Sequence, residues 1–367
     1  MNAASIERAL VPLDLARSRV MRVAVATKLG LFVVGRRDRR VAAQAMVGVL
    51  VTFMLVTFAP ALLLAVGPII FGVPHVASDV RYLVLRREVS RPAVMITLLF
   101  AGLVTSVRVV GMLAPHVFPW AGVEMVLLCS WIASAALAGA HRSGRKDHVA
   151  PVLLIALGAA VVVVPRPEVM AIVLAHAHNV VAIVVWLFVF RRNLRAATLP
   201  LLFAAIALAV ILSGATLPVS LAHSHALGLS LSDSASWLAP GLSTRVGIAI
   251  VLSFAFLQSM HYAVWLGWIP QEDLAAEGTL SFKMSVRSMM RDFGPRGLIV
   301  VIALTLLVVV GACCALTRTR ELYLGLAVFH GYLEMAMLAY FLCQKSTSQR
   351  HHVTGSPRKA TPASGWW

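Results

Sequence analysis

Long apolar segments separated by short basic loops dominate this sequence of 367 residues. About 20 apolar residues in a helix suffice to cross a bilayer core. We predict ten such spans, at 42–65, 67–86, 93–114, 120–140, 149–164, 168–190, 198–217, 245–268, 297–316 and 322–343. Because lipid cannot satisfy unpaired backbone groups, the expected fold is an all-α polytopic membrane helix bundle. The fifth segment is short and could be re-entrant instead of spanning.

The composition agrees with this class. Hydrophobic residues make up 60% of the chain and charged residues 13%, whereas a soluble domain is roughly half apolar and a quarter charged. The formal net charge of +17 would suit a nucleic-acid-binding protein. The placement of the charges between the apolar segments gives a different explanation.

Basic residues alternate from one side of the predicted bundle to the other. With the N-terminus in the cytoplasm, 26 of the 32 Lys and Arg fall in inside segments, as the positive-inside rule requires. The outside segments hold only Arg166, Arg245, Arg318 and Arg320. Removing any one span would destroy this asymmetry. We therefore expect both termini to be cytoplasmic, the partner to be a lipid bilayer, and nucleic acid not to be a partner.

The chain divides into three regions. Residues 1–41 form a basic cytoplasmic N-terminal segment, 42–343 a transmembrane helical domain, and 344–367 a disordered cytoplasmic tail rich in polar residues. Within the first region, residues 5–34 mix Arg and Lys with Leu, Val and Met. This pattern suits one or two interfacial helices on an anionic leaflet, and a solvated tail is the equal alternative.

One polar octapeptide interrupts the second apolar segment: Gly72-Val73-Pro74-His75-Val76-Ala77-Ser78-Asp79. Ionisable groups inside a membrane are expensive and usually belong to a site. Asp79 follows His75 by four residues, so both side chains lie on one helix face. Pro74 removes a backbone hydrogen bond and frees a carbonyl near residue 70. The octapeptide is the candidate centre of a functional site.

Other predicted spans supply partners for His75. Five of the 12 histidines lie within spans, namely His75, His176, His178, His261 and His330. At about 1.5 Å per residue, all but His261 lie within roughly 5 Å of their span centres, and His261 falls about 6 Å further toward the cytoplasm. Glu334 follows His330 as Asp79 follows His75. His176 and His178 are two residues apart, so at most one faces a shared centre.

Imidazoles and carboxylates without a thiolate favour non-haem iron over other metals. We expect Fe²⁺ to be bound by His75, His261, His330 and either His176 or His178. Asp79 and Glu334 would orient these ligands, bind the metal directly, or pair with Arg81. A haem held by two histidines is the alternative, and it leaves the other histidines unexplained. The sequence has no His-Glu-x-x-His motif, so an intramembrane zinc protease is not supported.

The octapeptide resembles the G-x-P-H-x-x-x-D motif of the Brp/Blh family of membrane β-carotene 15,15′-dioxygenases. Phe256–Tyr262 and Phe329–Glu334 resemble two later motifs of that family. The resemblance implies a polytopic bacterial cytoplasmic-membrane protein whose histidine-bound iron cleaves a carotenoid with O₂ to give retinal. The family's second motif, His-Phe-Gly followed by Asp, is missing, and Ala175–Asn179 is its nearest substitute. Gln258 stands where the third motif has its first histidine.

The sequence therefore predicts a membrane oxidoreductase that acts on a hydrophobic alkene, such as a carotenoid, with O₂. The expected catalytic residues are His75, Asp79, His261, His330 and Glu334. A transporter or proton-coupled channel could use the same polar groups to relay protons. In a third interpretation, a structural or signalling protein uses them only to fix helix packing. The substrate, the metal and the oligomeric state stay open at this point.

Overall fold

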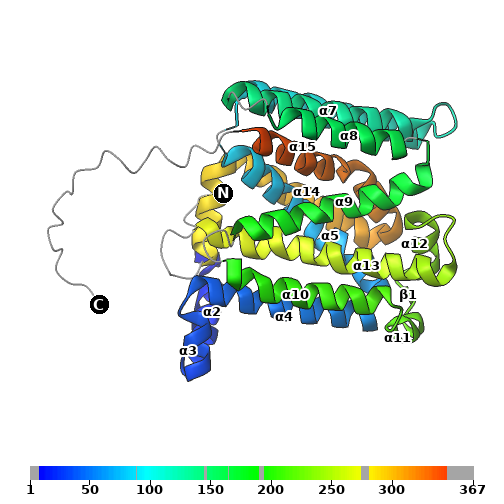
Figure 1. Cartoon of the computed structure of the whole chain (residues 1–367). Coiled ribbons are helices and arrows are strands. Elements are labelled where there is room, and N and C mark those ends of the chain that lie inside the picture. Colours follow the sequence, from blue (N-terminus) through cyan, green and yellow to red (C-terminus); the bar gives the residue numbers. More distant parts are fainter. Residues whose placement is uncertain are drawn as a thin grey trace.

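The computed structural model describes residues 8–87, 89–143, 147–163, 165–189, 194–273 and 281–344. The long helices lie side by side along one direction and form a bundle (Figure 1). Seven helical stretches in the described residues are long and apolar enough to cross a membrane, and Val149–Val162 and His176–Leu187 are shorter apolar helices. The predicted class, an all-α bundle of membrane helices, is confirmed.

The elements run in the following order. The first half of the chain holds α2 (Val11–Val25), α3 (Lys28–Val34), α4 (Arg37–Phe58), α5 (Pro60–Asp79), the π-helix η1 (Val80–Leu85), α6 (Arg91–Leu113), α7 (Trp120–Ser143) and α8 (Val149–Val163). The second half holds α9 (Pro167–Val189), α10 (Leu194–Leu212), α11 (Leu217–Ala222), the hairpin β1 (His225–Ala226) and β2 (Leu229–Ser230), α12 (Leu231–Leu238), α13 (Thr244–Ala263), the π-helix η2 (Val264–Trp268), the 3₁₀-helix η3 (Ile269–Asp273), α14 (Phe282–Ala327) and α15 (Phe329–Cys343).

The boundary between the first two predicted spans is wrong. We expected one span over 42–65, but α4 ends at Phe58 and α5 begins at Pro60. Ala59 between them has non-helical backbone, with φ −147° and ψ 46°. Proline fits the first helical position, where its missing N–H is not needed, and it disrupts a helix interior. Pro60 therefore starts the helix that carries His75.

The longest helical stretch, Phe282–Cys343, contains two interruptions in α14. Gly294 has φ 67° and ψ 169°, and Ala315 has φ −154° and ψ 79°. A Cβ placed on Gly311 would lie 3.2 Å from Thr319, although eight residues of straight helix span about 12 Å. The chain therefore turns back on itself near Ala315. The part of α14 before Gly294 is a separate short segment that starts at Phe282.

Two π-helices follow the stretches that carry candidate site residues. The first, η1, begins directly after Asp79, and η2 begins three residues after His261. Single π-turns within α-helices occur often at functional sites. The Ser78 hydroxyl donates to the Trp265 carbonyl at 2.8 Å. This bond ties the end of α5 to η2.

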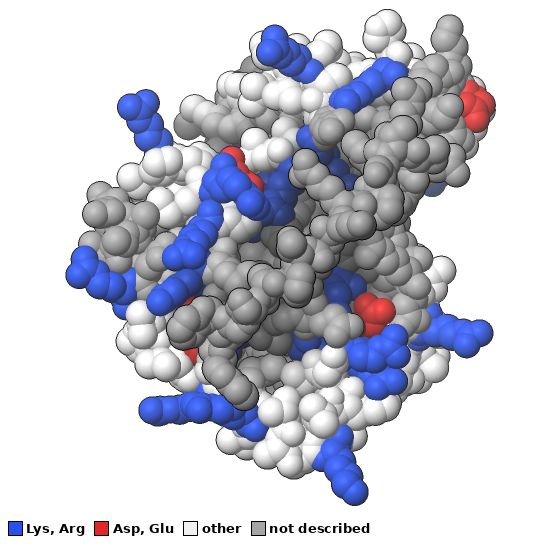
Figure 2. Space-filling model, turned by 90° about the vertical axis from the view of Figure 1, so that its left-hand side faces the viewer, with Lys and Arg blue, Asp and Glu red and all other residues white. Residues whose placement is uncertain are grey.

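Helices α2 and α3 lie at one end of the bundle, and α11, β1 and α12 lie at the other (Figure 1). Figure 2 shows the first end, where Lys and Arg side chains stand all around and few acidic ones appear. The Asp14 carboxylate of α2 accepts hydrogen bonds from the backbone N–H groups of Phe282, at 2.7 Å, and Lys283, at 3.3 Å. Within the described part of the basic N-terminal segment, α2 and α3 are helical and α4 begins at Arg37, and α2 is attached to the start of α14. The predicted disordered tail lies outside the described residues from 345 onward.

Helices α7 and α15 pack so closely that Gly139 is required between them. A Cβ at Gly139 would overlap the Tyr340 carbonyl of α15. We expect Gly139→Val to lower the free energy of unfolding by about 1–3 kcal/mol, the usual cost of overpacking. Thermal unfolding in detergent measures this loss. Gly122→Val in the same helix is the control, because its Cβ would meet nothing within 4 Å, and an equal loss in both variants would contradict the prediction.

Candidate metal centre

His75 lies at the centre of a buried polar cluster inside the bundle. Its side chain comes from α5 and is 1% exposed. Its Nε2 atom lies 2.7 Å from Nε2 of His261, 3.5 Å from Oδ2 of Asp79 and 3.7 Å from Oε1 of Glu334. A single proton on Nε2 can serve only one of these neighbours. Several electron-rich atoms therefore converge on one point with too few protons to pair them.

Glu334 reaches this point from α15, and its side chain is 0% exposed. Its Oε1 atom lies 3.0 Å from Nε2 of His261. From the sequence we expected Glu334 to support His330, four residues before it in the same helix. Glu334 instead contacts His261 of α13 and His75 of α5, because the side of α15 that carries Glu334 is turned toward those helices.

Two further imidazoles border the cluster. The His330 ring centroid lies 4.9 Å from that of His75, and the His178 centroid lies 5.2 Å from His261 and 5.8 Å from His330. Nδ1 of His330 hydrogen-bonds the Ala327 carbonyl. A carbonyl only accepts, so Nδ1 carries the proton and Nε2 keeps its lone pair for another partner. Helices α5, α9, α13 and α15 thus each contribute one histidine.

His176 and His178 occupy different surroundings. The His176 ring packs edge-on against Phe254, with centroids 6.0 Å apart, whereas His178 faces the cluster. This separation follows from their spacing of two residues, which places them on different helix faces. The structure brings together His75, His178, His261 and His330, and it leaves His176 apart. His261 was expected to lie closer to the cytoplasm than the other histidines, yet its Nε2 atom lies 2.7 Å from Nε2 of His75.

The cluster has the buried, unpaired atoms that a bound cation would satisfy. Both carboxylate oxygens of Asp79 and of Glu334 lack a partner in hydrogen-bonding geometry within the part of the chain that the structure describes. An unpaired buried carboxylate costs several kcal/mol. A cation is the partner that compensates two carboxylates and several imidazoles at once.

The spacing of three donor atoms also fits a metal ion. Nε2 of His75, Nε2 of His261 and Oε1 of Glu334 form a triangle with edges of 2.7, 3.0 and 3.7 Å. Its corners lie about 1.9 Å from a common centre, so a point just off the plane is about 2.1 Å from all three, the usual length of metal bonds to imidazole and carboxylate. His75, Asp79 and His330 form a second possible ligand group. These two are the only groups of three or more potential ligands among the described residues.

Two aromatic residues that we did not single out as site residues enclose the cluster. The Trp265 ring centroid lies 6.4 Å from His75 and 6.3 Å from His261, and the Tyr262 centroid lies 5.1 Å from His75. Both side chains are buried. Trp265 follows His261 by four residues, a spacing that shares a helix face and could have identified it.

Arg81 pairs with an acid outside the cluster. Its Nε donates to Oδ2 of Asp292 at 2.7 Å, and its NH2 group donates to the Ser288 hydroxyl at 2.8 Å. Arg86 donates to the same carboxylate oxygen at 2.6 Å. The π-helix η1 and the residue after it thus bring both arginines to Asp292 of α14.

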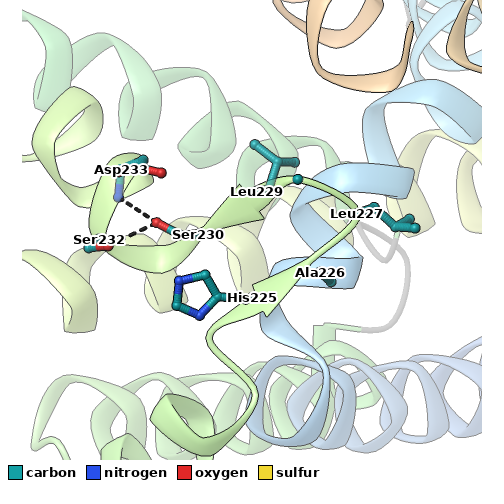
Figure 3. Close-up of a pocket in the computed structure, with 8 residues that line it drawn as sticks. His225, Ala226, Leu227, Leu229, Ser230, Ser232 and Asp233 are labelled. Carbon is teal, nitrogen blue, oxygen red and sulfur yellow. Dashed lines mark hydrogen bonds between the residues drawn. The ribbon is translucent and has the colours of Figure 1, made fainter.

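A separate pocket of about 510 Å³ lies at the opposite end of the bundle from α2 and α3 and is lined by the β1–β2 hairpin and the start of α12. Figure 3 shows His225 beside Ser230, whose hydroxyl accepts from the backbone N–H of Asp233 at 3.0 Å and contacts the Ser232 hydroxyl at 2.8 Å. These bonds cap α12. His225 itself contacts the Ser224 hydroxyl at 3.0 Å. This histidine therefore lies outside the buried cluster.

The fold and the cluster define a polytopic membrane helix bundle with a buried histidine and carboxylate centre. No family model, curated protein or solved structure matches the chain. The geometry of the chain's own residues is therefore the main basis for a function.

Proposed function

We propose that the cluster binds one Fe²⁺ ion and that the protein is a membrane oxidoreductase acting on a hydrophobic alkene with O₂. The observation that carries this proposal is the convergence of His75, His261 and Glu334 around one point. Two histidines and one carboxylate with open positions are characteristic of non-haem iron oxygenases. No thiolate belongs to either ligand group, which further favours iron over softer metals.

Each residue of the cluster has a role in this proposal. His75, His261 and Glu334 would hold the ion, and Asp79, whose Oδ2 lies 3.5 Å from the same Nε2 atom of His75, would be a supplementary ligand. His330 offers Nε2 as a further ligand because its Nδ1 proton is held by the Ala327 carbonyl. Tyr262 and Trp265 cover the centre and exclude water. Bound iron would supply the capacity to react with O₂.

The location of the centre supports an apolar substrate. The ligands are buried within a bundle of apolar helices, where a polar solute would lose its hydration. A carotenoid is the proposed substrate and retinal the proposed product, because Gly72–Asp79 resembles the first motif of the Brp/Blh dioxygenases. By the same resemblance, the bacterial cytoplasmic membrane is the proposed location.

Ten spans with both termini in the cytoplasm remain our proposal for the topology. The chain turn near Ala315 divides the longest stretch into two segments, and Val149–Val162 and His176–Leu187 add two shorter helices to the seven candidates. The gathering of Lys and Arg at the end that holds α2 and α3 supports a cytoplasmic assignment for that end. The 15 residues of α8 are about 22 Å long, less than a typical bilayer core, so α8 would need local thinning.

A proton-coupled transporter would need water to reach the same groups. The side chains of His75, His261 and Glu334 are between 0% and 1% exposed. This enclosure supports a metal centre over a proton relay, because a relay requires hydrated access from at least one side.

Metal analysis of purified protein tests the proposal. After anaerobic loading with Fe²⁺ in lipid nanodiscs and removal of excess metal, we expect about one iron per chain, because a preformed site of this kind retains its ion. A value below about 0.2 would overturn the metal centre. Incubation of the loaded protein with β-carotene and O₂ then tests the substrate separately, with retinal measured by chromatography.

A further inference from the structure

A buried arginine lies apart from the metal centre, in the last part of α14. Arg320 is 8% exposed, and a buried charge in a membrane bundle is costly and usually belongs to a site. Among the described residues no carboxylate forms an ion pair with Arg320, and the exposed Glu321 beside it in the chain offsets only part of its charge. An anion that binds the guanidinium directly would stabilise it.

A proline in α5 explains how the Arg320 side chain is held. Pro68 lies inside that helix and has no N–H to bond the carbonyl four residues earlier. That carbonyl belongs to Leu64, and it accepts a hydrogen bond from Nε of Arg320 at 2.8 Å. The guanidinium has five N–H donors, so four remain on its two terminal nitrogens. Neither terminal nitrogen bonds another described residue or is among the fully buried atoms without a partner. A ligand can therefore reach the open end of the guanidinium.

Tyr323 adds a hydroxyl donor next to Arg320. The two residues are three positions apart in α14, so their side chains share a helix face. A Cβ on Gly72 would overlap the Tyr323 hydroxyl, which therefore lies against α5. This hydroxyl makes no hydrogen bond to another described residue, and its proton is available to an acceptor. Two kinds of donor thus lie on one side of α14 without an acceptor of their own.

This site is near the end of the bundle that holds the hairpin. A Cβ on Gly228 of the hairpin would lie 3.5 Å from the Thr317 hydroxyl, three residues before Arg320. The hairpin lies at the end opposite α2 and α3 (Figure 1). Leu322, two residues after Arg320, is 55% exposed. In a membrane, lipid therefore reaches this part of α14.

The site is also separate from the metal centre. Arg320 contacts Leu64 near the start of α5, whereas the ring of His330 lies 4.9 Å from that of His75 further along the same helix. The ten residues from Arg320 to His330 correspond to about 15 Å of helix. A ligand of Arg320 therefore does not compete for the ion.

We propose that Arg320 and Tyr323 bind an oxyanion, either a carboxylate or a phosphate, near this end of the bundle. A guanidinium binds both groups through two parallel N–H···O bonds. The Tyr323 hydroxyl donates a third bond, and the Leu64 carbonyl fixes the orientation of the guanidinium. The oxyanion is carried by a lipid or fatty acid, or it is a soluble ion. The site does not depend on the proposed iron.

The test compares oleate with oleyl alcohol, which has the same chain and an uncharged head. Native mass spectrometry of the full chain released from detergent micelles measures the bound ligand. Arg320→Gln removes the cation and keeps an N–H donor for the Leu64 carbonyl. Arg318→Gln is the matched control, because Arg318 is an exposed arginine of the same helix. Tyr323→Phe removes the hydroxyl and keeps the ring against Gly72.

We expect the wild type and Arg318→Gln to bind oleate at least about tenfold more tightly than oleyl alcohol, a difference of about 1.4 kcal/mol. The preference should disappear in Arg320→Gln and fall at least about threefold in Tyr323→Phe, which loses one hydrogen bond to a charged group. Equal wild-type affinities for the two ligands, or a wild-type preference in Arg320→Gln, would overturn the proposal. If Arg320→Gln does not fold, an unchanged preference in Tyr323→Phe overturns it.

Competition identifies the source of the oxyanion. Displacement of oleate by excess inorganic phosphate would support a soluble anion. Displacement by dioleoylphosphatidic acid alone would support a lipid head group, and retention of oleate against both would support a carboxylate ligand. Each competitor is tested on the wild type and on Arg318→Gln, which should behave alike.

Discussion

Replacing His75 with alanine is expected to reduce bound iron from about one per chain to below about 0.2. His75 belongs to both possible ligand groups, and its Nε2 atom has polar neighbours from α13 and α15 at 2.7 and 3.7 Å. Removal of the imidazole leaves His261 and Glu334 without the third donor of the triangle. Even residues behind the ligands typically change metal affinity by about 10–100-fold, so loss of a ligand should exceed that range.

Two histidine variants serve as controls for this result. His225→Ala removes a histidine of the distant hairpin pocket, and His176→Ala removes one that packs against Phe254. Both should retain iron at the wild-type level when measured by mass spectrometry after anaerobic loading. Equal loss in all three variants would indicate non-specific binding, and full retention in His75→Ala would remove the metal centre from consideration. His178→Ala should bind iron more weakly than His176→Ala, since only His178 faces the cluster.

Glu124→Ala is expected to lower the free energy of unfolding by about 1–3 kcal/mol, the cost of leaving a buried hydrogen-bonding group without its partner. Oε1 of Glu124 accepts from Nε of Arg108 at 2.9 Å, lies 2.7 Å from its NH2 group, and also accepts from the Tyr332 hydroxyl. The Glu124 side chain is 3% exposed. Its removal leaves the buried Tyr332 hydroxyl and the half-buried Arg108 guanidinium without their shared acceptor. Unfolding in mixed detergent micelles, followed by tryptophan fluorescence, measures the loss.

The double variant Arg108→Leu with Glu124→Leu removes both charges and keeps an apolar side chain at each position. Replacing both partners by apolar side chains is often nearly neutral, so the double variant should recover most of the stability lost in Glu124→Ala. If the stability lost in the double variant equals the sum of the losses in the two single variants, Arg108 and Glu124 do not interact. Tyr332 lies two residues from His330 and from Glu334, so Glu124→Ala should also weaken iron binding by displacing α15.

The class of fold could be predicted because hydrophobicity and charge act locally. Each apolar run and each basic loop carries its own signal, and the rule that lipid excludes unpaired backbone groups converts these runs into helices. The role of His75 at the centre of a site was also predictable, since ionisable groups inside a membrane are costly and usually belong to a site.

The pairing within the site was less predictable, because it depends on how helices face one another. The spacing of His330 and Glu334 suggested a local pair, but Glu334 lies 3.0 Å from His261 of another helix. Arg81 lies two residues from Asp79, yet it pairs with Asp292, 211 residues away. The π-turns in η1 and η2 change the directions of the residues that follow them, and they arise from tertiary packing that no periodicity reveals.

The four imidazoles of the cluster come from positions 75, 178, 261 and 330, which spreads one small site over most of the length of the chain. During synthesis the first of them is inserted long before the last leaves the ribosome, so no chain that ends before residue 330 can contain all four imidazoles. An ion held there would connect early and late helices and would close loops of many tens of residues. A metal link that closes a long loop reduces the conformational entropy of the unfolded chain more than one that closes a short loop. Occupancy of the site would therefore report that membrane insertion has been completed in the correct order.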